Sequence, residues 1–408
     1  MDSIVPLCLR CKGKGLCGKP CPLLARYNEH KVEFVSLKEN FNASGIAPFI
    51  GRIGYPEITV GLLSPPSVKD DAWALDAPDY WYGKQYALDD IIGARMQVIN
   101  SRGKGNQVKL AQMPSKQLEV AQEVAMSSNT PSVEFWLDKK PFVSFQLDLS
   151  ASPVGAFGAL NKVKLEENAN VSRKVDKVVT DELKAAEQMK KMYGKGIDVN
   201  QLMRILSTGL LGDQKRKKLV PTRWAITATD DTIGKQLIND IKDYNWVDTY
   251  ELYVNEYIGN KFYVLLMPGV WQYELIEVWY GGSLWNPTTS VSVSTDYENV
   301  FGRKNYAKDT AGGYYAARIG VLEYLARIRK QAACLIMREI SPEYSIPVGV
   351  WEVRENVRNS FFNKLTFDTL EGALTEIKNQ FKTPVDGLIQ NSKLLANYKQ
   401  QSTLKKWF

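Results

Sequence analysis

The chain has 408 residues, of which 44% are hydrophobic and 11% aromatic, and its formal net charge is +7. This length and composition predict a large globular protein with two or three domains. No apolar run approaches the roughly 18 residues of a membrane span, and the first residues lack a signal-peptide core, so we expect a soluble, cytoplasmic protein. The net charge permits attraction to polyanions such as DNA without establishing it.

The histidine content limits the chemistry that the chain can perform. His30 is its single histidine, which excludes HExxH zinc sites and two-histidine relays, and the spacing that a histidine-based triad needs is absent around it. Any reaction must therefore use Asp, Glu, Lys, Arg, Tyr or a metal.

Four of the five cysteines, Cys8, Cys11, Cys17 and Cys21, lie within the first 21 residues. The glycines between them allow the tight turns that wrap a short loop around one ion. Four thiolates at this spacing predict a tetrahedral Zn²⁺ site, because so short a segment cannot form a core unaided. Disulfides are the alternative, which a reducing cytoplasm disfavours. Neighbouring lysines leave open whether the knuckle contacts phosphates.

The first half of the chain is predicted to mix loops, strands and one charged helical region. Residues 41–66 are dense in Gly and Pro and indicate an ordered loop system with an extended run over 57–63. Residues 133–138 and 142–148, separated by KKP, predict a hairpin. The charged stretch 172–193 has a helical period. A basic loop follows, either solvated or facing phosphates, with Lys215, Arg216, Lys217 and Lys218.

The second half is predicted to form a sheet and then helices. We expect strands near 223–229, 249–258, 261–267, 273–280 and 290–295, with a hairpin at Gly259 and Asn260. A helix is expected over 231–243, and longer ones over 311–333 and 366–400 with a break near Pro384. Strands in succession favour an antiparallel sheet. The predicted class is α+β, a largely antiparallel sheet with packed helices, a small N-terminal zinc knuckle of four cysteines and a flexible C-terminal tail.

This organisation gives four predicted segments. They are the zinc-binding segment 1–26, an α+β region over 27–288, a mainly helical region over 289–395 and a tail over 396–408.

Two aspartates stand at the end of the strand expected at 223–229. Asp230 and Asp231 either cap the following helix or, with Lys235, hold Mg²⁺ or act in acid–base chemistry. The spacing alone leaves both alternatives open.

Charged side chains also gather in the last third of the chain. Gly312 and Gly313 precede a helix that carries Arg318 and has a cationic face with Arg327 and Lys330, and glycines at a helix start can admit an anion. The following segment alternates acids and arginines among apolar residues. It forms either an ion-pair network or a polar cleft for a nucleotide or phosphate, with Arg338, Glu339, Arg354, Glu355 and Arg358.

The last residues match a motif that docks on the sliding clamp PCNA. Gln401, Leu404, Trp407 and Phe408 fit the spacing Q-x-x-h-x-x-a-a, where h is aliphatic and a aromatic. One helical turn places the three apolar side chains on one side as a plug for a partner's groove, while Gln401 hydrogen-bonds separately. Packing back onto the same chain is the alternative.

The cysteine knuckle and this tail, together with GRIGYPEITVGLLSPP, PTRWAITATDDTIGK, GGYYAARIGVLEYL and REISPEYSIPVGVWEVRENVR, resemble the archaeal Nre family of DNA-repair proteins. The resemblance covers nearly the full length. It implies repair of DNA damage together with PCNA, clamp contacts from the four tail residues and a zinc-finger role for the four cysteines. Trp407 stands where Phe or Tyr is usual in such boxes. No catalytic residue is carried over.

Three hypotheses follow for the function. The first is a DNA-repair factor that the clamp recruits and that contacts DNA weakly through basic patches and the zinc knuckle. The second is an enzyme that acts on a nucleotide or a damaged base with carboxylates and a divalent metal. The third is a clamp-recruited scaffold that never contacts DNA.

Overall fold

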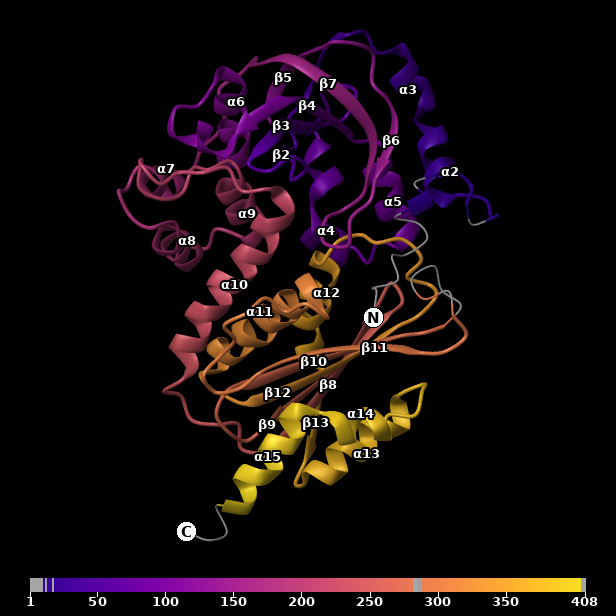
Figure 1. Cartoon of the computed structure of the whole chain (residues 1–408), viewed down its shortest axis with the longest axis vertical. Helices are drawn as coiled ribbons and strands as arrows, with labels where there is room; N and C mark the ends of the chain where they lie inside the picture. Colours follow the sequence, from indigo (N-terminus) through magenta and orange to yellow (C-terminus); the bar gives the residue numbers. More distant parts are fainter. Residues whose placement is uncertain (1–9, 12, 17, 282–285, 287, 405–408) are drawn as a thin grey trace. The chain divides into compact units, whose positions relative to one another are not determined.

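The structure is a computed structural model that describes residues 10–11, 13–16, 18–281, 286 and 288–404 (Figure 1). Contacts divide these residues into two compact units. The N-terminal unit comprises residues up to 233 together with 347–349, and the C-terminal unit comprises 234–346 and 350–404. The division falls inside one helix, α10 (Thr222–Ile241), which both units share.

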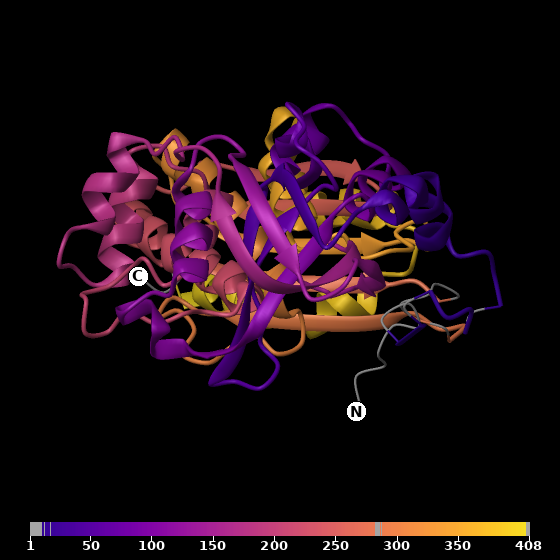
Figure 2. The same cartoon turned by 90° about the horizontal axis from the view of Figure 1, so that it is seen from above.

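The N-terminal unit is built on a sheet in the order β1-β5-β7-β4-β3-β2, with β6 paired to β7. Its strands cross one another at steep angles when viewed from above, as twisted sheets do (Figure 2). The pairing of β4 with β7 is parallel and the other pairings of this sheet are antiparallel. The strands are β1 (Asn40–Ser44), β2 (Ala47–Ile50), β3 (Glu57–Ser64), β4 (Ile99–Gln107), β5 (Ser132–Leu137), β6 (Phe142–Gln146) and β7 (Val154–Leu165).

Helices surround this sheet, and α6 (Lys116–Met126) packs against β2, β3 and β7. Ser115 caps α6 by accepting the N–H of Leu118, which satisfies a donor that the first turn leaves free. The other helices are α2 (Pro22–Glu29), α3 (Lys31–Ser36), η1 (Ala72–Asp76), α4 (Pro78–Gly83), α5 (Leu88–Met96), η2 (Val108–Gln112), α7 (Arg173–Val179), α8 (Ala185–Gly194) and α9 (Val199–Ser207).

The C-terminal unit is built on a second sheet in the order β11-β10-β12-β9-β8-β13. The strands are β8 (Tyr250–Tyr257), β9 (Asn260–Met267), β10 (Gln272–Trp279), β11 (Ser292–Glu298), β12 (Ala333–Ile340) and β13 (Lys364–Phe367). Every residue of β12 is buried, because helices cover both faces of the sheet. Figure 1 shows α11 (Ala311–Ile328) and α12 (Trp351–Arg358) on one face, and α13 (Leu370–Gln380), α14 (Asp386–Asn391) and α15 (Lys393–Leu404) on the other.

The two faces of the second sheet have different chemistry. The face under α13 and α15 is an apolar core that includes Leu265, Met267, Leu335, Met337 and Leu374. The face under α11 and α12 carries charged side chains from β10 and β12, because alternate residues of a strand point to opposite faces. The second sheet thus has an apolar layer on one face and a layer of buried ion pairs on the other.

The predicted α+β class is confirmed, as are the four strands between 249 and 295 and the hairpin in which Tyr257 pairs with Asn260. Two other predictions are wrong. Residues 223–229 form the start of α10 rather than a strand. The carbonyl of Pro221 accepts the N–H groups of Trp224 and Ala225, which begins the helix just before these residues. The expected hairpin 133–148 is absent, since β5 and β6 both pair with β7 instead of with each other.

The boundary predicted at 288 falls within the second sheet, because β10 pairs with both β11 and β12. In the described part of the chain, no helix combines the length and apolarity that crossing a bilayer requires.

Candidate nucleic-acid interface

The basic loop lies between α9 and α10 in the N-terminal unit. Lys215, Arg216 and Lys218 are exposed and Lys217 is partly exposed. Arg216 is held by Asp213, with Nε 2.5 Å from Oδ2. The ammonium groups of the three lysines contact no carboxylate among the described residues, so they are available to an anion. A cluster of unpaired lysines is what phosphate contact requires.

The backbone of this loop is fixed even though its lysine side chains are free. Gln112 donates from Nε2 to the carbonyl of Lys215 at 2.8 Å, and Gln214 donates to the carbonyl of Gln112 at 2.6 Å. At its end, Ser207 donates to the carbonyl of Val220 at 2.8 Å. The loop therefore presents its lysines from a rigid frame.

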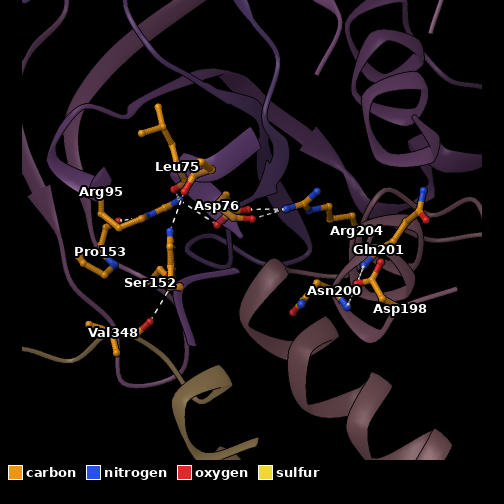
Figure 3. Close-up of polar contacts among 12 residues, drawn as sticks. Leu75, Asp76, Arg95, Ser152, Pro153, Asp198, Asn200, Gln201, Arg204 and Val348 are labelled. Carbon is orange, nitrogen blue, oxygen red and sulfur yellow. Dashed lines mark hydrogen bonds and ion pairs between the residues drawn. The ribbon is translucent and has the colours of Figure 1, made fainter. Parts of the chain in front are cut away.

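The helix that precedes the loop is anchored by a partly buried carboxylate between two arginines (Figure 3). Asp76 forms an ion pair with each: its Oδ1 lies 2.8 Å from Arg95, and its Oδ2 lies 2.7 Å from Arg204 of α9. Burial lowers the pKa of Arg95, while Asp76 acts to raise it. Arg95 also donates to the carbonyls of Leu75 and Pro153, so this cluster fixes α5, η1 and α9 together.

Asp198 caps the same helix, accepting the N–H groups of Asn200 and Gln201 at 2.8 and 3.0 Å (Figure 3). Both ends of α9 are thus tied down, and the basic loop starts from a fixed point.

Two of the four predicted zinc ligands are described. Cys11 is buried, and its Sγ accepts the N–H of Leu16 at 3.2 Å. Burial acts to raise the pKa of Cys11, but N–H groups of Leu16, Lys14, Gly15 and Gly13 outweigh it and lower the pKa. Such a thiol fits a thiolate ligand. Cys21 precedes α2 and is partly exposed.

Cys8 and Cys17 lie outside the described residues. Within the described part, no group of three or more His, Cys, Asp or Glu gathers as a metal site. The zinc site therefore remains a prediction. The lowered pKa of Cys11 is consistent with a zinc ligand at this position.

Asp230 and Asp231 lie in the middle of α10, so their predicted place at a strand end is wrong. Asp230 is fully buried, Asp231 is partly exposed and Lys235, one helical turn further on, is exposed. A mid-helix position leaves neither aspartate free to cap the helix. Both the capping and the strand-end arguments for these residues are lost.

Arg338 is the centre of a buried charge cluster in the C-terminal unit. Its guanidinium lies 2.6 Å from Glu277 and 3.0 Å from Glu352, and it donates to Asn260 Oδ1 at 2.6 Å. Asn356 donates to Glu352 at 3.0 Å. One cation between two carboxylates leaves a net negative charge, and burial raises the pKa of Glu352 to about 7, against the opposing effect of Arg338.

The other predicted charges are also paired in the C-terminal unit. Arg318 of α11 lies 2.8 Å from Glu298 with both side chains almost fully buried. Arg358 of α12 holds Glu323 of α11 through two hydrogen bonds of 2.6 and 2.7 Å and also contacts Glu355. Arg354 is buried on α12.

Glu339 faces the opposite layer, where it accepts hydrogen bonds from Tyr263, Tyr280 and the backbone of Lys382. These contacts favour the ion-pair network over the polar cleft, because the carboxylates of Glu298, Glu339 and Glu352 are buried against protein donors.

The predicted tail begins within α15. The helix continues through Leu404, so the backbone of Gln401 and Leu404 is helical. Trp407 and Phe408 lie outside the described residues.

Sequence analysis missed one group, centred on Arg102 of β4. Its Cζ lies 4.7 Å from the ring centroid of Phe49 and 5.3 Å from that of Phe157. No motif marks it, and only the pairing of β2, β3, β4 and β7 brings the three residues together.

Comparisons with known proteins match almost the entire chain. The family model described as "Archaeal Nre, N-terminal" matches residues 16–286 and "Archaeal Nre, C-terminal" matches 298–407. The chain is 37% identical to "DNA repair protein NreA" of Haloferax volcanii, over 86% of each chain. It is 35% identical to "DNA repair protein NreB" of Archaeoglobus fulgidus, over 97% of this chain and 98% of the relative. It is 33% identical to "DNA repair protein NreA" of the same organism, over 98% of each. No solved structure matches.

Proposed function

Because the chain belongs to the archaeal Nre family, with relatives named DNA repair proteins, we propose that it is a DNA-repair factor recruited to DNA by the sliding clamp PCNA. The match of 33 to 37% identity over 86 to 98% of the chain supports the repair role, and the clamp-motif spacing of Gln401, Leu404, Trp407 and Phe408 supports the recruitment. Identity on this scale extends across both units and is not confined to one motif.

DNA contact comes from the basic loop in this proposal. Three lysines without carboxylate partners among the described residues, on an anchored backbone, supply a sequence-independent attraction to phosphates. Clamp binding raises the local DNA concentration, so weak contacts suffice.

The zinc knuckle stabilises the N-terminal segment in this proposal. The loop that holds Cys11 packs against Phe145, because a Cβ on Gly13 of this loop would lie 2.7 Å from that ring. Zn²⁺ bound by Cys8, Cys11, Cys17 and Cys21 would fix this loop against the unit. Metal analysis should find about one zinc per chain, and a Cys11→Ser variant should lose it. Zinc-free protein with intact thiols would refute the site.

The clamp contact is tested by titrating PCNA with the full chain and with a Trp407→Ala, Phe408→Ala variant. Loss of two aromatic anchors should weaken binding by about 2 kcal/mol or more. Equal affinities would remove the recruitment proposal.

DNA contact is tested by measuring the affinity for a duplex as salt increases. A linear fall of log affinity with log salt is expected. Absence of any DNA binding at low salt would favour the scaffold hypothesis instead.

The enzyme hypothesis receives less support from the geometry. Asp230 is fully buried within a helix, and Glu352, the carboxyl with a pKa of about 7, is sealed between Arg338 and Asn356. General acid–base work needs a group that reaches the substrate.

A further inference from the structure

Arg102 is a partly buried cation without a counter-ion in the described part of the chain. Its guanidinium lies between the rings of Phe49 and Phe157, and its Nε is buried with no hydrogen-bond partner. No carboxylate among the described residues pairs with it, and burial alone lowers the pKa of Arg102 to about 10. A desolvated charge that no partner offsets destabilises the fold. A bound anion would supply the missing acceptors and offset this cost.

The two rings determine what remains available on this guanidinium. Both rings lie within cation–π distance of the guanidinium, a contact that leaves its N–H donors without acceptors. These coplanar donors match the paired oxygens of a phosphate. The arrangement preorganises one residue for an anion.

The close approach of β3 and β4 at Gly61 sets the position of Arg102. Gly61 of β3 pairs directly with Arg102, and a Cβ on Gly61 would lie 2.3 Å from the carbonyl oxygen of Ser101 and 2.8 Å from Arg102 Cγ. Only glycine leaves room for the strands to approach so closely beneath the aliphatic part of Arg102.

Two amide side chains on the same face have unused hydrogen-bonding groups. Asn100 donates to Gln146 Oε1 at 2.9 Å, yet Asn100 Oδ1 and Gln146 Nε2 are buried with no partner. Asn100 is fully buried and lies two residues from Arg102 on β4. Both atoms are out of reach of solvent, so they add unsatisfied polar groups beneath the cation and are not themselves contacts for a ligand.

An exposed aromatic ring extends this face outwards. Phe142 of β6 pairs with Phe157, with 5.4 Å between their ring centroids, and 43% of Phe142 is exposed. Lys139 lies over the Phe142 ring at 5.1 Å and is itself exposed. Bases stack on such rings with little dependence on sequence, and a nearby lysine meets the next phosphate.

We propose that this face binds an unpaired nucleotide of single-stranded DNA, its phosphate on the Arg102 edge and a base stacked on Phe142. The inference rests on the proposed repair function, because it names the form of DNA that the N-terminal unit takes. Duplex DNA offers no free base face to Phe142, so the site selects single strands.

The test compares the full chain with three variants by fluorescence anisotropy, using labelled oligo(dT) of about 12 nucleotides and a duplex of equal length. Arg102→Gln removes the charge and keeps the length. Phe142→Leu removes the ring and keeps an apolar side chain. Arg173→Gln is the matched control, since Arg173 is an exposed arginine on α7.

We expect Arg102→Gln and Phe142→Leu to weaken oligo(dT) binding by about 5- to 150-fold, with duplex binding changed less than about twofold. Arg173→Gln should change each by less than about twofold. The melting temperature of Arg102→Gln should stay the same or rise, because no ion pair is broken and an uncompensated charge is removed.

Equal oligo(dT) affinity of the wild type and both site variants would overturn the inference while leaving duplex binding, and so the proposed function, intact. If thymidine monophosphate binds in an Arg102-dependent way and oligo(dT) does not, the site takes a free nucleotide and the single-strand inference is wrong. Loss of all DNA binding by the wild type would refute the proposed function itself.

Discussion

The strands of the two sheets hold arginine side chains in different surroundings. In the C-terminal unit, Arg338 of β12 lies against the carboxylates of Glu277 and Glu352 at 2.6 and 3.0 Å. In the N-terminal unit, Arg102 lies between aromatic rings with no carboxylate partner in the described part. A matched buried cation is part of the scaffold, because its partners are already present. An unmatched one marks a place where a partner is expected from outside.

The largest expected effect comes from removing the centre of the paired network. Arg338→Met leaves Glu277 and Glu352 buried without their cation, which should cost about 3 to 5 kcal/mol of unfolding free energy. Arg102→Met should cost far less, since no carboxylate loses its partner. Denaturant unfolding of both variants checks this contrast, and equal losses would erase the distinction between the two sheets.

A second prediction concerns pH. The pKa of Glu352 is raised from 4.5 to about 7 in the folded chain, so the folded state holds this proton more tightly than the unfolded state does. Stability is therefore lost as pH rises through this window, by up to about 3 kcal/mol. Glu352→Gln should flatten the fall in Tm between about pH 5 and 8. Parallel curves for the two proteins would contradict the assignment.

A smaller effect is expected at Gly61. Gly61→Ala forces a contact of 2.3 Å with the Ser101 carbonyl oxygen and should cost about 1 to 3 kcal/mol. Gly83→Ala is the control, because no atom lies within 4 Å of its added Cβ. Thermal melts should separate the two, and a neutral Gly61→Ala would mean that the strands beneath Arg102 have room to spare.

The smallest effect on stability is expected at the basic loop. A Lys215→Gln, Lys217→Gln, Lys218→Gln variant should keep its unfolding free energy within about 0.5 kcal/mol. Its slope of log duplex affinity against log salt should fall by up to about three. An unchanged slope would move phosphate contact away from this loop.

The second sheet was more predictable from the sequence than the first. Its strands over 249–295 have alternating or continuous apolar runs bounded by turns, and the hairpin at Gly259 follows from a residue with φ of 76°. The family resemblance was also correct. Residues 223–229 misled because Ile and Thr favour strands locally, while packing along 20 residues of α10 decided the outcome.

The missed site has a physical explanation. Phe49, Arg102, Phe142 and Phe157 are distant in sequence and meet only through the pairing of β2, β3, β4, β7 and β6. Long-range register of this kind leaves no local motif. The charged residues of the last third of the chain pair with Glu277 and Glu298, which lie far from them in sequence. The sequence therefore could not decide between an ion-pair network and a polar cleft.

The most direct test of recruitment measures the affinity of the full chain for primed DNA with and without a loaded PCNA ring. The account predicts tighter binding when the ring is present, by about 10²-fold or more, and no such gain for the Trp407→Ala, Phe408→Ala variant. An equal gain for both proteins, or none for the wild type, would contradict it.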